Sequence, residues 1–130
     1  MKIIVTGGAS GIGKAISESL RSTSFEVISA DMNPGNGDQK LDVSDENSWE
    51  ELFDYTGTVY GLVNCAGGRT RNLIVDTSVE EFEHHLKVNL TGTWLGIRSL
   101  FRNHSEGKAA SIVNIASVNA VIAVPGQAHY

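Results

Sequence analysis

Cysteine is almost absent from this sequence, and so are the usual signs of secretion. The chain has 130 residues and a single cysteine, Cys65, which has no second thiol with which to form an internal disulfide. Its N-terminus shows no positively charged segment followed by an apolar one, so we predict no secretory leader. Both features are typical of a reducing compartment and predict a cytoplasmic protein.

Excess positive charge and long apolar runs are also missing. Lysine and arginine number 10 against 15 acidic residues, which gives a formal net charge of −5. Without a basic stripe, the chain is not expected to bind nucleic acid or an anionic membrane. The longest apolar candidate, residues 86–101, is interrupted by Lys87, Asn89 and Arg98, whereas a membrane span needs about 18 or more uninterrupted apolar residues.

The spacing of the histidines does not favour a metal site. His84 and His85 are adjacent, so they point to different sides of a helix and make a poor pair of ligands. We interpret both of them, together with His104 and His129, as surface residues. The sequence therefore predicts no bound metal.

What the sequence does contain is a regular alternation of strand and helix patterns. We expect strands at residues 2–5, 26–30, 40–41, 59–63 and 110–115, and helices at 11–22, 45–55 and 79–102. Ser44 is the expected cap of the second helix, and the third is expected as one helix or as two with a break. Continuous apolar strands between helices are typical of an α/β fold, with a parallel sheet covered on both faces. We expect one domain over residues 1–130.

The last predicted helix has a clear apolar face. Its apolar residues recur at three- and four-residue steps, and they are Phe82, Leu86, Leu90, Trp94, Ile97 and Phe101. Asn89 shares this face, and a buried amide must be satisfied by backbone, water or a ligand. A core asparagine and a ligand-contacting one both remain open.

Residues 6–13, with the sequence TGGASGIG, form a glycine-rich turn between the first strand and the first helix. In such a turn, glycine lets the backbone approach a ligand closely or adopt a positive φ. A dinucleotide pyrophosphate can then bind the exposed N–H groups at the positive end of the helix. The residues that would hold it are Gly7, Ser10, Gly11, Ile12 and Gly13. An ordinary glycine-rich turn between strand and helix is the alternative.

Asp31 closes the second strand, eighteen residues after Gly13. A carboxylate there can accept hydrogen bonds from the adenosine ribose of a dinucleotide, and it would repel the 2′-phosphate of NADP. No arginine or lysine precedes Gly11 in the turn, and Met32 follows Asp31. The pattern favours NAD, with a solvated aspartate at the strand end as the alternative.

Further candidates follow the third and fourth strands. Asp42, which precedes Val43, could accept from the adenine amino group or could belong to a turn. The fourth strand runs into Asn64, Cys65, Ala66 and Gly67, at the sheet edge where ligands of open α/β sheets bind. Small residues there would admit the cofactor ribose, although a tight turn would also need them. Cys65 is most simply a small apolar core residue.

Taken together, these residues resemble the short-chain dehydrogenase/reductase family. The resemblance covers the whole chain and rests on the glycine turn, Asp31, the Asp42-Val43 pair, residues 64–67, Asn89, and Ser117 thirteen residues before Tyr130. One departure from the family is small. The family usually has asparagine where Cys65 stands, and that asparagine is not usually assigned any chemistry. The resemblance implies a Rossmann-like doubly wound sheet and an NAD(P)-dependent oxidoreductase, with NAD favoured.

The implied reaction is hydride transfer between nicotinamide and a secondary alcohol or a carbonyl. The resemblance makes Tyr130 the general acid/base, Ser117 the group that holds the substrate oxygen, and Asn89 the anchor of a water in the proton relay. It also implies a homo-oligomer, a dimer or a tetramer, acting on a small molecule. The particular substrate cannot be read from these residues.

The second departure is larger. In the family a lysine follows the tyrosine by four residues, and position 134 lies beyond this sequence. A free tyrosine has a pKa of about 10, so its ionisation near pH 7 needs a nearby positive charge. We therefore expect the chain to be the N-terminal portion of such an enzyme, without its C-terminal strands. The alternative is a dinucleotide-binding fragment that catalyses nothing.

Overall fold

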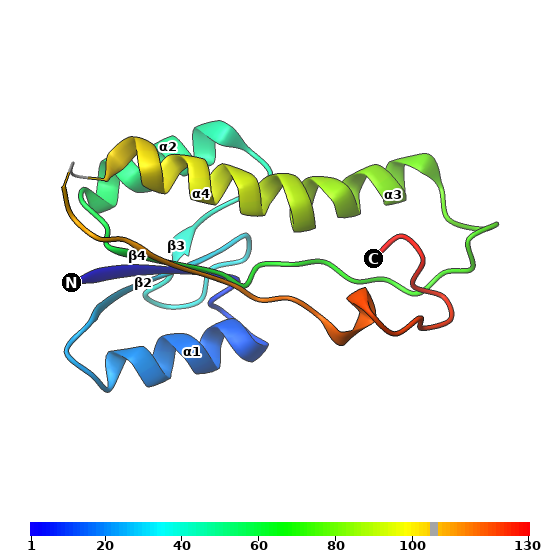
Figure 1. Cartoon of the computed structure of the whole chain (residues 1–130), viewed down its shortest axis with the longest axis horizontal. Coiled ribbons are helices and arrows are strands. Elements are labelled where there is room, and N and C mark those ends of the chain that lie inside the picture. The colour runs from blue at the N-terminus through cyan, green and yellow to red at the C-terminus, as the bar shows by residue number, and fades with distance from the viewer. Residues whose placement is uncertain (105–106) are drawn as a thin grey trace.

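The computed structural model describes residues 1–104 and 107–130, and these residues form a five-stranded parallel sheet (Figure 1). The strand order is β3-β2-β1-β4-β5, and every neighbouring pair is parallel. The strands are β1 (Lys2–Thr6), β2 (Glu26–Asp31), β3 (Gln39–Lys40), β4 (Gly61–Asn64) and β5 (Ser111–Asn114). The chain adds β2 and β3 on one side of β1, then crosses to add β4 and β5 on the other. The order therefore reverses between β1 and β4, where ligands of such sheets bind.

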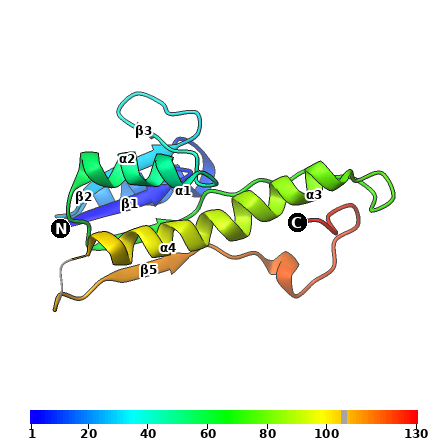
Figure 2. The same cartoon turned by 90° about the horizontal axis from the view of Figure 1, so that it is seen from above.

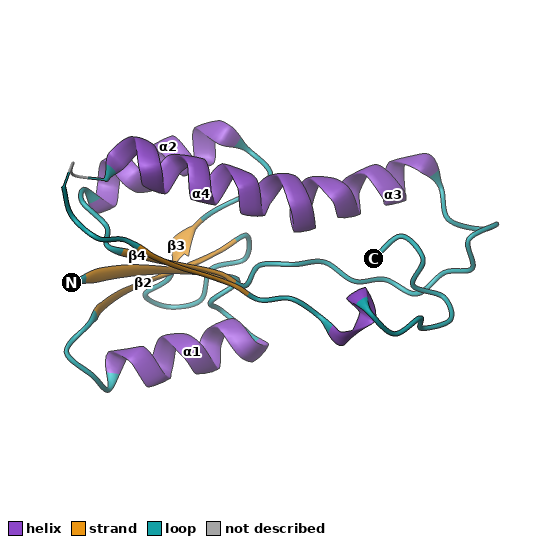
Figure 3. Cartoon of the chain, in the orientation of Figure 1, coloured by secondary structure: helices purple, strands orange, loops and turns teal. Residues whose placement is uncertain are grey.

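Helices cover the sheet from both sides (Figure 3). Helix α1 (Gly11–Arg21) lies on one face, and α2 (Glu46–Thr56) and α4 (Gly92–Asn103) lie on the other. Helix α3 (Val79–Leu86) continues the line of α4 beyond the end of the sheet, beside the C-terminal segment (Figure 2). This arrangement confirms the predicted α/β, Rossmann-like doubly wound sheet.

The main core fills the space between the sheet and helices α2 and α4. Its central side chain is Trp49, which is fully buried and donates a hydrogen bond of 2.9 Å from Nε1 to the carbonyl of Val43. A Cβ at Gly96 would lie 2.8 Å from the Trp49 ring, so only glycine lets α4 pack this closely. The remaining fully buried apolar residues include Ile4, Leu62 and Leu100.

The long helix packs on the rest of the protein through a face other than its stripe of large apolar residues. The small residues Gly92 and Gly96 face the sheet together with Leu95 and Leu100, because they allow a close approach. The predicted apolar face points largely to solvent instead, and Leu90 is 65% exposed. Residues Lys87–Thr91 form a π-helical turn that joins α3 to α4. The helical segment therefore runs without a break, but it is not a regular α-helix throughout.

The start of α2 differs from the prediction by one residue. Asp45, not Ser44, is the N-cap, and its carboxylate accepts a hydrogen bond of 3.2 Å from the backbone N–H of Asn47. The Ser44 hydroxyl donates to Asp42 Oδ1 at 2.7 Å and is therefore engaged one step earlier in the turn. Both residues have the polar side chain that favours an N-cap, so the pattern alone could not separate them.

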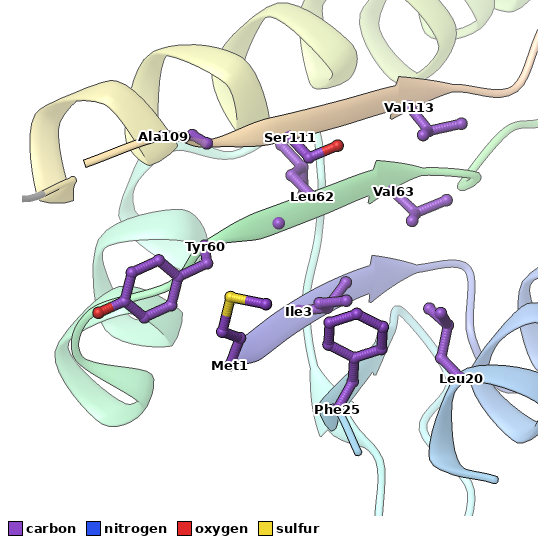
Figure 4. A pocket seen from close by; sticks show the side chains of 12 residues that line it. Met1, Ile3, Leu20, Phe25, Tyr60, Leu62, Val63, Ala109, Ser111 and Val113 are labelled. Atoms are coloured by element: carbon purple, nitrogen blue, oxygen red, sulfur yellow. The ribbon is translucent and has the colours of Figure 1, made fainter. Parts of the chain in front are cut away.

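An apolar hollow of about 430 Å³ lies beside α1 on the face of the sheet that this helix covers only in part (Figure 4). Phe25 and Leu20 line one side of it, and Ile3, Val63 and Val113 line the sheet side. Val113 of β5 is 49% exposed. No described helix has the length and apolarity that crossing a membrane requires.

Candidate functional site

A cleft of about 620 Å³ opens where the strands β1, β4 and β5 end. Its walls come from four parts of the chain that are distant in sequence. The residues that line it include Gly7, Ser10, Gly11, Ile12 and Gly13 from the glycine turn, Asn64, Ala66 and Gly67 after β4, Asn89 from the π-helical turn, and Ser117 and Tyr130 from the C-terminal segment. The structure thus brings together most of the site residues that the sequence predicts.

Glycine is needed at several positions of the turn, for different structural reasons. Gly7 and Gly11 have φ values of 66° and 51°, which favour glycine. A Cβ at Gly13 would lie 2.2 Å from the carbonyl oxygen of Gly7, and a Cβ at Gly7 would lie 2.9 Å from Cα of Ala66. The turn, the start of α1 and the loop after β4 are therefore in direct backbone contact. This contact leaves no room for side chains between them.

Thr6 connects the ends of the two central strands. Its Oγ1 accepts hydrogen bonds of 3.0 Å from the backbone N–H groups of Cys65 and Ala66. The Thr6 hydroxyl also lies 3.4 Å from the carbonyl of Val63, to which it can donate. These bonds hold the loop after β4 against the glycine turn and fix the shape of the cleft between them.

The N-terminus of α1 is suited to an anion. Ser10 occupies the N-cap position with an extended backbone, and its side chain makes no capping hydrogen bond to the described residues. The first turn of α1 contains no acidic residue. Free N–H groups and the positive end of the helix dipole therefore face the cleft beside a backbone cradle that a Cβ would fill. A dinucleotide pyrophosphate fits these residues.

Asp31 lies at the edge of the glycine turn. Its Oδ2 accepts a hydrogen bond of 3.1 Å from the backbone N–H of Ala9, and its Oδ1 accepts one of 2.9 Å from Asn33. The carboxylate therefore holds the glycine turn and the turn after β2 at once. It is half-buried and lies beside the cleft, not in its wall.

Asp42 and Val43 lie outside the cleft. Asp42 Oδ1 accepts from the backbone N–H of Ser44 at 2.9 Å, so this aspartate is part of a turn, as the alternative interpretation had it. The Val43 side chain is 8% exposed and belongs to the core. A contact of this pair with adenine stays a prediction.

The loop after β4 is shaped by two asparagines. Asn64 is 5% exposed and donates from Nδ2 to Asn114 Oδ1 at 2.9 Å, which joins β4 to β5 at the floor of the cleft. Asn89 makes a closed pair with Gly68: its Oδ1 accepts from the Gly68 N–H at 2.9 Å, and its Nδ2 donates to the Gly68 carbonyl at 3.1 Å. The amide of Asn89 is thus satisfied by backbone.

Cys65 lies between these two anchors and is half-buried. Burial raises the pKa of the Cys65 thiol, which keeps it protonated and unreactive at neutral pH. Cys65 lines the cleft and does not belong to the hydrophobic core, so its interpretation as a core residue is wrong.

Ser117 and Tyr130 line the same cleft although thirteen residues separate them. Ser117 caps a short 3-10 turn (Val118–Ala120), and its Oγ accepts from the N–H of Asn119 at 3.2 Å. The Asn119 side chain donates a hydrogen bond to the side chain of Gln127. This bond holds the C-terminal segment close to the cleft. Tyr130 is 41% exposed there.

A polar cluster beside Tyr130 was missed by the sequence analysis. His85 and His129 are 2% and 6% exposed, so their interpretation as surface residues is wrong. Their rings lie 4.7 Å apart, and Thr70 Oγ1 lies 3.0 Å from His85 Nε2 and 2.9 Å from His129 Nε2. The same hydroxyl contacts Glu81 at 2.5 Å. Forty-four residues separate the two histidines, and no local pattern could have paired them.

Hydrogen bonds hold the pKa of Glu81 below its usual range. The largest effects are the bonds from Thr70 and Asn72, and the nearby His129 and His85 add to them. Asn72 donates from Nδ2 to Glu81 Oε2 at 2.9 Å. The carboxylate is therefore ionised at neutral pH. Ser78 is the N-cap of α3, and its Oγ accepts a hydrogen bond of 3.1 Å from the Glu81 N–H.

Comparison with known proteins gives a consistent result. The family model described as short chain dehydrogenase matches residues 1–130. An NADP-dependent (R)-specific alcohol dehydrogenase of Lentilactobacillus kefiri is 32% identical, over 94% of this chain and 56% of that protein. A cyclopentanol dehydrogenase of Comamonas testosteroni is 30% identical, over 98% of this chain and 59% of that protein.

A solved structure has the same fold. The 4-hydroxyisoleucine dehydrogenase complexed with NADH superposes with a TM-score of 0.90 at 30% sequence identity, over 99% of this chain and 61% of that one. The chain thus spans little more than half the length of the relatives it matches. Because the family model covers every residue from 1 to 130, the chain belongs to the short-chain dehydrogenase family.

Proposed function

We propose that this chain carries the cofactor site and part of the active site of an NAD-dependent oxidoreductase that interconverts a secondary alcohol and a carbonyl compound. The observation that carries the proposal is the shared cleft: Ser117 and Tyr130 line the same hollow as the glycine turn. A binding site for a dinucleotide alone would need the turn, and would not need a serine and a tyrosine gathered beside it.

The residues that would hold the cofactor are those of the glycine turn and of the loop after β4. The N–H groups at the start of α1 would bind the pyrophosphate, and Ala66 and Gly67 would leave space for the ribose beside the nicotinamide. Asp31 would accept from the hydroxyls of the adenosine ribose. When bound, the nicotinamide supplies or accepts a hydride at its C4 atom.

The other residues of the cleft would handle the oxygen and the proton of the substrate. Tyr130 would take the proton from the alcohol in oxidation and return it in reduction. Ser117 would hold the substrate oxygen by a hydrogen bond. Asn89 would keep the loop after β4 in place through its two bonds to Gly68, and the resemblance assigns it a water of the proton relay as well.

An exposed apolar stripe supports a homo-oligomer, and the low cysteine content supports a cytoplasmic location. Large apolar side chains along α3, the π-helical turn and α4 are exposed in one stripe, which includes Leu90, Trp94 and Phe101, and exposed apolar patches mark association surfaces. The single cysteine favours a reducing compartment. The alternative function is dinucleotide binding without catalysis.

The preference for NAD over NADP depends on Asp31. The relatives differ on this point, since one is named as NADP-dependent and another was solved with NADH. The carboxylate would gain a charge-assisted hydrogen bond from the ribose of NAD, worth about 1.5 to 3 kcal/mol. The same carboxylate would face the 2′-phosphate of NADP and repel it.

We therefore expect calorimetric titration to show NAD binding at least about tenfold more tightly than NADP. Asp31→Ala should narrow this ratio. Asp31→Asn removes the charge and its repulsion but keeps one side-chain oxygen, which can still accept from the N–H of Ala9, while the bond from the N–H of Asn33 is lost. We expect Asp31→Asn to improve NADP binding and to keep the fold of the turn.

Asp54→Ala is the matched control, since it removes the same charge from an exposed position on α2. It should leave both affinities unchanged. Equal or tighter binding of NADP by the unmodified chain would contradict the proposed cofactor. An unchanged ratio in both Asp31 variants would show that another residue sets the preference.

A further inference from the structure

Three metal-ligating side chains meet outside the proposed cofactor site. Glu81 and His85 lie one helical turn apart on α3, and His129 comes from the C-terminal segment. Each offers one ligand atom, and these atoms all lie within 4.8 Å of one another. The residues that line the cleft do not include any of the three.

The atoms converge on one point, which the Thr70 hydroxyl now occupies. Thr70 Oγ1 lies 2.5 Å from Glu81 Oε1, 3.0 Å from His85 Nε2 and 2.9 Å from His129 Nε2. Rotation of this exposed threonine about χ1 would clear the point. In a tetrahedral zinc site the ligand atoms are about 3.4 Å apart, as bond lengths near 2.0 to 2.1 Å require. Each side chain would then move by less than about 1 Å.

The surrounding groups already orient two of the three side chains as ligands. Asn72 holds the second carboxylate oxygen of Glu81 at 2.9 Å, so Oε1 is left to face the histidines. Thr77 Oγ1 lies 3.5 Å from His129 Nδ1, which leaves Nε2 facing the centre. Such outer contacts fix the orientation of metal ligands. His85 Nδ1 is buried with no hydrogen-bond partner among the described residues.

We propose that Glu81, His85 and His129 bind a divalent cation of the zinc class. Two imidazole nitrogens and one carboxylate oxygen suit Zn²⁺, and they suit Mg²⁺ or Ca²⁺ poorly because those cations prefer oxygen ligands alone. Three protein ligands leave a fourth position on the side of Thr70, which is exposed to solvent. The cation would join α3 to the segment that ends in Tyr130. The proposal stands whether or not the chain is an oxidoreductase.

The test is a zinc titration of the chain without a histidine tag, by competition with a chromophoric chelator. We expect one Zn²⁺ per chain, whatever the association state, and a visible absorption band of tetrahedral Co²⁺ when cobalt replaces zinc. Glu81→Gln and His129→Gln should each weaken the binding of Zn²⁺ at least tenfold. Gln keeps the size and polarity of each position, so loss of fold is not the expected cause.

His84→Gln is the matched control, because His84 is the exposed neighbour of His85 on the same helix. It should leave Zn²⁺ affinity unchanged. Thr70→Ala should retain or tighten Zn²⁺ binding, since it removes the hydroxyl from the centre of the cluster. A chain that retains no Zn²⁺ at micromolar concentrations would overturn the proposal, as would His129→Gln binding as tightly as the unmodified chain.

Discussion

Replacement of Gly13 by alanine should weaken NAD binding by at least about a hundredfold, equivalent to roughly 2.7 kcal/mol. The new Cβ would lie 2.2 Å from the carbonyl oxygen of Gly7 and 2.7 Å from its carbonyl carbon. Both are backbone atoms, so the clash cannot be relieved by rotating a side chain. Either the glycine turn or the start of α1 must move, and these two segments form the proposed pyrophosphate cradle. Calorimetric titration with NAD measures the loss, and far-ultraviolet circular dichroism checks the fold.

Two further glycine substitutions separate this clash from ordinary backbone strain. Gly11→Ala also changes the turn, but a Cβ there has nothing within 4 Å, so the cost is the positive φ of 51° alone, about 1 to 2 kcal/mol. Gly37→Ala is the control. Gly37 has a φ of 87° and equally open surroundings, and it lies outside the glycine turn. We expect the loss of NAD binding to be greatest for Gly13 and absent for Gly37. Unchanged NAD affinity in Gly13→Ala would contradict the proposed cradle.

The parallel sheet and the glycine turn could be predicted because their signals are local. Continuous apolar runs in residues 3–5 and 59–63 need burial on both faces, and only a covered sheet provides it. The turn at residues 6–13 combines a strand, glycines and a helix within a short stretch. Asp31 ends β2 next to β1, so the parallel pairing of these strands brings its carboxylate to the turn.

The orientation of the long helix could not be predicted from its apolar spacing. The spacing identifies a stripe of large residues, and it does not say whether the sheet or solvent faces that stripe. Here the sheet selects the opposite face, where Gly92 would clash with Val43 if it carried a Cβ, at 2.8 Å. Close packing of the α4 backbone against the side chains of Val43 and Trp49 outweighs the burial of larger side chains such as Leu90 and Phe101. An exposed stripe of this kind is available to another chain.

The histidine cluster shows a second limit of sequence reasoning. Adjacent histidines on a helix point apart, and this argument correctly separates His84 from His85. It cannot show that His85 turns inward to meet His129, which approaches from a segment without any period. Thr70 and Glu81 complete the contact from two further places in the chain. Contacts of this kind depend on tertiary structure alone.

In a chain that continues past Tyr130 with a lysine at position 134, Tyr130→Phe should lower the turnover of a secondary alcohol with NAD by about a hundredfold to ten-thousandfold, the usual range for a general acid/base. The substitution removes one hydroxyl from a half-exposed ring in the cleft wall, so NAD affinity should stay within about twofold. Tyr55→Phe is the matched control, because Tyr55 loses the same hydroxyl at an exposed position of α2. It should affect neither quantity.

The 130-residue chain and a chain continued past Tyr130 with a lysine at position 134 would show different results in this assay. A phenol gives up its proton near neutral pH only beside a positive charge, and the family resemblance puts a lysine at position 134. We expect NAD binding by both chains and turnover by the continued chain alone. If the continued chain turns over alcohols and Tyr130→Phe does not slow it, the tyrosine is not the proton carrier. If it binds NAD and turns over no secondary alcohol in a broad panel, dinucleotide binding without catalysis is the function that the cleft serves.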